Sequence, residues 1–270
     1  MEKGDVLSHY IIGDIHGCLD GLNALLNKIA PSSADKLSFV GDLVGKGPDD
    51  WNVLELIRSI PNAQIILGNW DLSFLKQHYA AMIEQRLSEE QMLCYALLQH
   101  ASLAKWHVQT DTLLVHAGIW PGWSLREILS LASEVEAVLK DHDLLQGYVQ
   151  NFSGNEDQWR AELTGWKRVR CIVNIFTRMR TLDDKMRMCF DYTGPVNSQL
   201  STDGTNRRTP WYQWQEHWPC KQIIFGHWAM LKGETGRHDI INIDGGYVYG
   251  GSLIAINCET QERIVVKSQG

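Results

Sequence analysis

Residues 10–17 read YIIGDIHG, a short apolar run followed by a glycine, Asp14 and His16. The same order of apolar run, glycine and metal-binding side chain recurs in three more places: LSFVGD (37–42), IILGN (65–69) and IIFGH (223–227). Short apolar runs of this length predict buried strands, and a glycine permits a sharp turn and close approach of the backbone to an ion. The repeated pattern therefore predicts one site built where several strands end.

Helical patterns separate these runs. Apolar residues recur every three or four positions at 22–29 and at 53–60, and a third helical segment begins near Asp71, a plausible N-cap. A further helical stretch is expected at about 88–105, and residues 240–266 read as strands joined by glycine-rich turns. Alternating strands and helices followed by a strand-rich tail predict an α/β sandwich.

The 270 residues contain no repeat, low-complexity tract or linker, so we expect a single domain spanning 1–270. The segment at about 141–219 is polar, irregular and rich in tryptophan. We interpret it as an insertion over one end of the sheets, where substrate loops usually lie.

Composition excludes several classes of protein. The net charge of -7 offers no general attraction to nucleic acid or to an anionic membrane, so we expect no sequence-specific nucleic-acid binding. A phosphate-bearing substrate must then be held by local cations or by metal. The six cysteines form no CxxC pair and are expected to be reduced thiols. No stretch has the pattern of a signal peptide or a membrane span, which favours the cytoplasm.

The side chains at the ends of these runs, together with the histidine that ends LLVH (113–116), form a metal-binding set. They are three imidazoles, two carboxylates and one amide oxygen: His16, His116, His227, Asp14, Asp42 and Asn69. Ligands gather at the carboxyl ends of strands in α/β sheets, so these positions can converge. A single Asp after a strand is usually a helix cap and a single His a hydrogen-bonded core residue, but the recurrence favours two metal ions. The chemistry suits manganese, iron, cobalt or zinc better than calcium.

The sequence resembles a known family through several blocks in order. GDIHG (13–17), GDLVGKG (41–47), GNWD (68–71), HAG (116–118) and GH (226–227) resemble the signature of the phosphoprotein-phosphatase-type metallophosphoesterases. Within that superfamily, the bacterial symmetrical diadenosine tetraphosphatases are most similar, through HAGIWP (116–121), NIFTRMR (174–180), FGHWAMLKG (225–233) and YGGSL (249–253). The resemblance covers nearly the whole chain.

The resemblance implies two mixed sheets packed together and flanked by helices, the calcineurin-like sandwich. It implies that Asp14, His16 and Asp42 hold one metal ion. Asp42 would bridge to a second ion, held also by Asn69, His116 and His227. Manganese is the metal expected first. The reaction implied is cleavage of diadenosine tetraphosphate into two ADP, and the family is also credited with removing similar caps from RNA.

Phosphoryl transfer needs positive charge on the phosphoryl oxygens. Lys46 lies in the same turn as Asp42, and Arg178 and Arg180 follow in the 174–180 block. We predict that Lys46 and Arg178 act with Asp42 in catalysis and that all three cations bind phosphate; a solvated basic edge is the alternative for the arginines. Adenine could stack on one of several tryptophans, although core packing is the commoner role for each: Trp120, Trp123, Trp211, Trp214 and Trp228.

Two positions depart from the family pattern. Trp70 stands where the family usually has the histidine that protonates the leaving oxygen, and Lys46 stands where it usually has arginine. An indole N–H cannot serve as that acid, and a lysine lacks the bidentate fork of arginine. Three hypotheses remain: a dinucleoside tetraphosphate hydrolase with full or reduced activity, a non-catalytic nucleotide or metal binder, and a serine/threonine protein phosphatase.

Overall fold

The computed structural model describes residues 7–196 and 208–269, and its framework is two β-sheets. The larger sheet has the order β11-β10-β1-β2-β3, with strands Arg263–Lys267, Ser252–Asn257, His9–Ile12, Lys36–Phe39 and Gln64–Ile65. The second sheet has the order β4-β5-β8-β9, with strands Ala104–His107, Thr112–Val115, Gln222–Phe225 and Ile240–Asn242. A short pair, β6 (Thr181–Asp183) and β7 (Arg208–Pro210), lies apart from both.

The strands that precede the predicted ligands run parallel to one another within each sheet. β1, β2 and β3 pair in parallel, as do β5, β8 and β9, while β10, β11 and β4 pair antiparallel to their neighbours. Parallel strands place their carboxyl ends at the same edge of a sheet, so the topology brings the glycine-containing turns together.

Apolar side chains fill the space on both faces of the sheets. One buried cluster joins the two sheets and takes members from strands of both: Ile11, Val40, Ile66, Leu114, Ile224, Ile241, Ile243, Ile254, Ile256 and Cys258. The neighbouring residues Ile12 and Val115 point the opposite way, into the larger cluster under the helices. This alternation is the two-residue period of strands buried on both faces, and it confirms the predicted sandwich of two packed mixed sheets.

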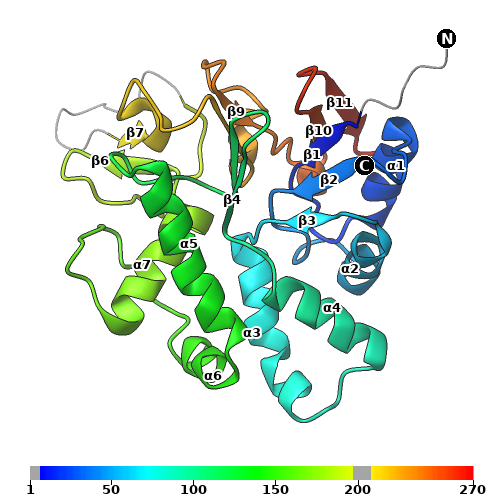
Figure 1. Ribbon diagram of the computed structural model, residues 1–270, viewed down its shortest axis with the longest axis horizontal. Helices are drawn as coiled ribbons and strands as arrows, with labels where there is room; N and C mark the ends of the chain where they lie inside the picture. The colour runs from blue at the N-terminus through cyan, green and yellow to red at the C-terminus, as the bar shows by residue number, and fades with distance from the viewer. Residues whose placement is uncertain (1–6, 197–207, 270) are drawn as a thin grey trace.

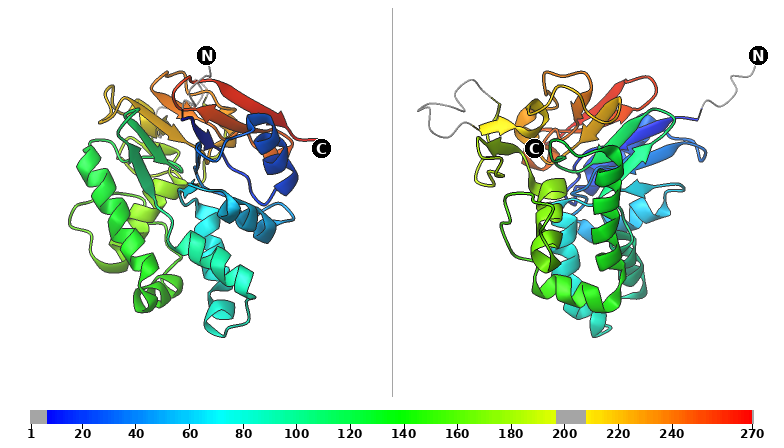
Figure 2. Two further views of the ribbon diagram at one scale, coloured as in Figure 1. Left: turned by 45° about the vertical axis from the view of Figure 1, so that its right-hand side comes forward. Right: turned by 60° about the vertical axis from the view of Figure 1, so that its left-hand side comes forward.

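Seven α-helices surround the sheets in the described part of the chain: α1 (Leu19–Ile29), α2 (Asp50–Ser59), α3 (Asn69–Ile83), α4 (Glu89–Gln99), α5 (Leu125–Lys140), α6 (His142–Gln150) and α7 (Gly165–Arg178). Figures 1 and 2 show α3 to α7 gathered on one side of the molecule, below the sheets in Figure 1, with α1 and α2 beside the larger sheet. No helix in the described residues combines the length and the apolar character needed to cross a membrane.

Three sequence-based predictions about local structure were wrong. The helical stretch expected at 88–105 ends at Gln99, because strand β4 begins at Ala104. Asp71 is not the N-cap of α3: the helix begins at Asn69 after Gly68, and Asp71 occupies its third position. The segment 141–219 contains α6 and α7 and is therefore not irregular throughout; its residues 197–207 lie outside the described residues.

The glycines before the ligand positions are required by close packing. Gly41 has φ +95°, and a Cβ there would lie 2.6 Å from both the Gly68 nitrogen and His116 Nδ1. A Cβ at Gly226 would collide with the Asp14 carboxylate. Any larger residue at either position would push the strand ends apart, so these glycines let the two sheets meet at the site.

Candidate metal centre

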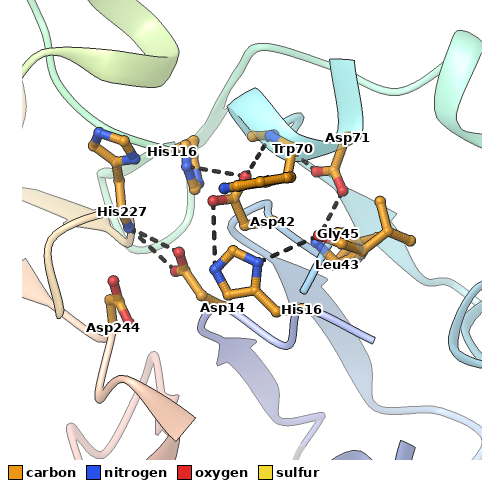
Figure 3. A network of polar contacts seen from close by, with 12 residues as sticks. Asp14, His16, Asp42, Leu43, Gly45, Trp70, Asp71, His116, His227 and Asp244 are labelled. Atoms are coloured by element: carbon orange, nitrogen blue, oxygen red, sulfur yellow. Dashed lines mark hydrogen bonds and ion pairs between the residues drawn. The ribbon is translucent and has the colours of Figure 1, made fainter. Parts of the chain in front are cut away.

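The predicted ligands converge where β1, β2, β5 and β8 end. Two groups each have their ligand atoms within 4.8 Å of one another: Asp14, His16 and Asp42 form one, and Asp42, His116 and His227 form the other. Figure 3 shows Asp42 between the imidazoles of His16 and His116. The strand ends thus bring together five of the six residues selected from the sequence, and the sixth, Asn69, lines the same cavity.

Asp42 belongs to both groups and turns one oxygen to each. Its Oδ2 lies 3.6 Å from His16 Nε2, and its Oδ1 lies 3.4 Å from His116 Nε2. The side chain is 2% exposed. Burial alone would raise its pKa, but the neighbouring His116 and His16 lower the pKa of Asp42 below its ordinary value. A carboxylate that stays ionised between two ligand groups is suited to bridging two cations.

Backbone carbonyls orient all three imidazoles. His116 Nδ1 lies 2.7 Å from the Val40 oxygen, His16 Nδ1 lies 3.3 Å from the Val44 oxygen, and His227 Nε2 lies 3.2 Å from the Arg178 oxygen. A ring nitrogen that donates to a carbonyl leaves the other nitrogen with a lone pair for a metal. Each ring is therefore fixed with a ligand nitrogen directed to the centre.

Two atoms in the centre are buried with unsatisfied bonding capacity. Asn69 Oδ1 makes no hydrogen bond to any described residue, and His116 Nε2 has only its 3.4 Å contact with Asp42 Oδ1. A buried acceptor with no partner is costly, and native structures usually satisfy it with water or an ion. Both atoms are chemically competent metal ligands, so the residues present fit a divalent ion.

The charges of the centre also favour bound cations. Asp14 accepts two hydrogen bonds from the His227 backbone N–H, at 3.2 and 3.1 Å, yet burial and then repulsion from Asp244 and Asp42 raise its pKa well above the usual range. Burial, with Asp42 nearby, likewise raises the pKa of Asp244 to about 6. Figure 3 shows Asp244 facing Asp14 and His227. Buried like charges of this kind are stable as anions only beside positive charge, which bound metal would supply.

Three ligand residues adopt left-handed backbone conformations, which are uncommon for residues other than glycine. The φ angles are 52° for His16, 50° for Asp42 and 62° for His227. Such conformations cost free energy and persist where surrounding contacts determine them. The His16 backbone N–H donates to the backbone carbonyl oxygen of Asp42 at 2.8 Å, which joins the turn after β1 to the turn after β2.

Asp71 holds the Asp42 turn against the start of α3. Its Oδ1 accepts from the Leu43 N–H at 2.9 Å and its Oδ2 from the Gly68 N–H at 2.8 Å. The Trp70 N–H in turn donates to Asp42 Oδ1 at 2.9 Å. Burial and then the charge of Asp42 raise the pKa of Asp71 to about 7. Asp71 therefore fixes the turn that carries Asp42, a role that its position near the start of a helix only partly indicated.

The centre opens into a cavity of about 840 Å³ whose wall carries two of the predicted cations. Lys46 Nζ lies 4.5 Å from the centroid of the Trp70 ring and 5.4 Å from that of Tyr249. Arg180 is largely buried, and its Nη2 donates to the His227 backbone oxygen at 2.9 Å. Arg180 is thus part of the cavity wall and not a solvated edge.

Arg178 occupies a different place from Arg180. It lines a smaller cavity of about 310 Å³ next to the metal centre. Arg178 is the last residue of α7, and the chain then turns toward β6, so side chains two positions apart face different cavities.

The structure changes the list of aromatic candidates. Four of the five named tryptophans are buried in the core: Trp120, Trp123, Trp211 and Trp228. Of the five, Trp228 alone also lines the main cavity. The aromatic rings at its mouth are instead Trp70 and Tyr249, and Tyr249 is 65% exposed.

Asp244 and Tyr249 line the cavity but are not among the residues selected from the sequence. The run Ile240 to Ile243 ends in Asp244 as the run LLV ends in His116, without a preceding glycine, and this resemblance could have identified it. Tyr249 lies in the YGGSL block but carries no pattern of its own.

Comparison with known proteins identifies relatives over almost the full chain. The model of the calcineurin-like phosphoesterases matches residues 9–230. A symmetrical bis(5'-nucleosyl)-tetraphosphatase of Coxiella burnetii is 36% identical, covering 99% of this chain and 95% of the relative. One of Legionella pneumophila is 35% identical and covers 97% of each. A solved structure assigned as a diadenosine tetraphosphatase aligns with a TM-score of 0.63 over 99% of this chain and 96% of its own, at 22% identity, and supports the fold.

Because Asp42 belongs to both ligand groups, Asp42→Asn is expected to lose metal from both, whereas His227→Ala is expected to lose it from one. The amide keeps the size of the carboxylate, so the comparison isolates its charge. Elemental analysis of both purified variants after loading with manganese and dialysis measures the difference. Equal loss in the two variants, with circular dichroism showing both folded, would contradict the bridging role of Asp42.

Proposed function

Because the chain belongs to the calcineurin-like phosphoesterases and, within them, to the symmetrical bis(5'-nucleosyl)-tetraphosphatases, we propose that it hydrolyses diadenosine tetraphosphate into two ADP. The observation that carries the proposal is the pair of ligand groups sharing Asp42 at the base of a cavity that also holds Lys46 and Arg180. This arrangement offers two metal ions to the bond that is cut and separate cations to the rest of a polyphosphate.

We assign the metal ligands as the sequence predicts them. Asp14, His16 and Asp42 would hold one ion, and Asp42, Asn69, His116 and His227 the other. Divalent ions bound there supply Lewis-acid stabilisation of the phosphoryl charge and lower the pKa of water. Manganese is proposed first; iron, cobalt and zinc accept the same donors.

Lys46 and Arg180 are proposed to hold and orient the phosphates. The chain is acidic overall, so capture of a polyanion depends on cations inside the cavity. Arg180 is fixed by its hydrogen bond to the His227 oxygen, and its Nε is buried without a partner among the described residues. Lys46 is held near two aromatic rings, which restrains a flexible side chain by cation–π attraction. Both are thus preorganised donors for phosphate oxygens.

The residue at position 70 favours a phosphoanhydride over a phosphate ester of serine. The Trp70 ring lines the cavity but cannot protonate a departing oxygen. An alkoxide is a strong base, with bulk water at about 15.7 as a guide, and needs that proton. The terminal phosphate of ADP titrates near about 6 and can leave as an anion at neutral pH, stabilised by nearby cations. The chemistry of the cavity therefore suits a tetraphosphate better than a phosphoprotein.

Two finer proposals concern a second substrate and the cellular compartment. A nucleoside tetraphosphate at the end of an RNA carries the same anhydride, so it is a second candidate substrate. All six cysteines are unpaired, and four of them are buried, which supports a reducing compartment such as the cytoplasm.

The direct test is the product pattern of purified, manganese-loaded protein given diadenosine tetraphosphate. We expect ADP as the only nucleotide product, because addition of water across the central anhydride leaves a nucleoside diphosphate on each side. AMP with ATP would contradict symmetrical cleavage. No cleavage by protein with a full complement of metal would favour the non-catalytic binder.

The role of position 70 is tested by comparing Trp70→His with Trp70→Phe, since the phenylalanine removes the indole without adding a titratable group. We expect the histidine to raise hydrolysis of a phosphoserine peptide by more than tenfold over the phenylalanine, because general acids commonly contribute about 10²–10⁴-fold. Tetraphosphate hydrolysis should rise by a smaller factor. Equal gains on the two substrates would show that a histidine there positions phosphate and does not donate a proton.

A further inference from the structure

A second, smaller cavity lies beside the metal centre. It measures about 310 Å³ and shares Asn69 with the main cavity, so the two meet at a predicted metal ligand. Its walls come from α3, from the turn that follows α6, and from α7. We call this space the helical slot; it is lined by Asn69, Leu72, Ser73, Phe152, Ser153, Gly154, Asn155, Val173, Asn174, Thr177 and Arg178.

The walls of the helical slot combine three apolar side chains with seven polar or charged ones. On α3, Leu72 and Ser73 follow Asn69 by three and four positions and therefore lie on one face of the helix. Val173 lines it from α7, and the ring of Phe152 lines it from the turn. The volume is at the small end of the range for small-molecule sites. The apolar side chains offer a surface on which a base can pack, and the polar ones offer hydrogen-bond partners for its edge.

Arg178 supplies the slot with a cation that is held in place. Its Nη1 donates to Asn155 Oδ1 at 3.1 Å and to Asn174 Oδ1 at 3.0 Å, and its guanidinium lies 4.4 Å from the ring centroid of Phe190. Asn174 is itself fixed by donating to two backbone oxygens of the 154–156 turn. The Nε and Nη2 of Arg178 make no hydrogen bond to any described residue. A restrained guanidinium with free donors is suited to a phosphate.

The slot is also tied to the metal centre through the backbone. The Arg178 carbonyl oxygen lies 3.2 Å from His227 Nε2 and orients that ring. Arg178 would thus bind phosphate with its side chain, while its backbone oxygen orients the predicted metal ligand His227.

Symmetrical cleavage leaves a nucleoside diphosphate on each side of the broken bond, so the substrate has two equal arms. The main cavity runs from the metal centre toward Lys232 and Arg263 and can take one arm. We propose that the helical slot binds the other, with its base against Phe152 and between α3 and α7, and its phosphate on Arg178. This inference rests on the proposed function, and it assigns the slot to a nucleoside diphosphate.

The test is binding of ADP, measured by calorimetry on the manganese-loaded protein. We expect two ADP sites per chain in the parent protein. Ser73→Phe fills the slot and should remove one of them. Phe152→Ala removes the stacking surface and should weaken one site by about tenfold, since stacking of a base on an aromatic ring is worth that much or more.

A matched control is available on the same helix. Ala80 is exposed and lines none of the cavities described above, so Ala80→Phe adds the same ring to α3 outside the slot. It should bind ADP as the parent does. A loss of one site in Ala80→Phe equal to that in Ser73→Phe would mean that the helix, and not the slot, was disturbed, and would overturn the assignment. If Ser73→Phe does not fold, Phe152→Ala decides the question.

Measurements of activity distinguish a failure of the slot proposal from a failure of the proposed function. The ratio of kcat/KM for diadenosine tetraphosphate to that for a small aryl phosphate should fall in Ser73→Phe, because an aryl phosphate has no second arm. If the parent protein cleaves the tetraphosphate, and both slot variants keep its ADP binding and this ratio, the slot proposal is wrong and the proposed function stands. A parent that binds two ADP, loses one in Ser73→Phe and cleaves nothing would support the slot and overturn the function. A parent that binds one ADP or none would overturn the slot.

Discussion

The two oxygens of one buried carboxylate, that of Asp42, face two different groups of metal-binding side chains, and the rest of the structure serves this arrangement. Asp42 adopts a left-handed backbone conformation with φ 50°, which turns its side chain back over the ends of the strands. Gly41 and Gly68 leave room for that turn, and Asp71 ties it to the start of α3 through two backbone N–H groups. These contacts stabilise the turn and offset the free energy that its left-handed conformation costs.

Charge is the second constraint. Asp14, Asp42 and Asp244 are all buried at one point, and burial with mutual repulsion raises the pKa of Asp14 and Asp244. In a protein without cations these groups would take up protons and lose their value as ligands. Divalent ions would remove the repulsion and satisfy the Asn69 and His116 atoms together. The same feature that makes the centre costly to fold therefore makes it a strong metal site.

The sequence predicted that the candidate metal ligands converge, because parallel strands place their carboxyl ends together and a linear pattern becomes a spatial one. It could not predict what depends on the packing of helices. Polar composition hid α6 and α7 within 141–219, and the helical slot depends on α3 and α7 lining the same cavity. Arg178 and Arg180 looked equivalent in one basic block, yet the end of α7 sends them to different cavities. Asp71 was predicted to be an N-cap from its neighbours in the sequence. Its hydrogen bond to the Leu43 N–H joins residues far apart in the sequence, and no local pattern shows it.

The central claim is that Asp42 bridges two metal ions. Anomalous diffraction near the manganese edge, from crystals of the protein loaded with manganese, measures this most directly. The account predicts two anomalous peaks, one on each side of the Asp42 carboxylate. The peak on one side should touch Asp14 and His16, and the peak on the other should touch His116 and His227. A single peak, or two peaks of which only one contacts Asp42, would contradict it.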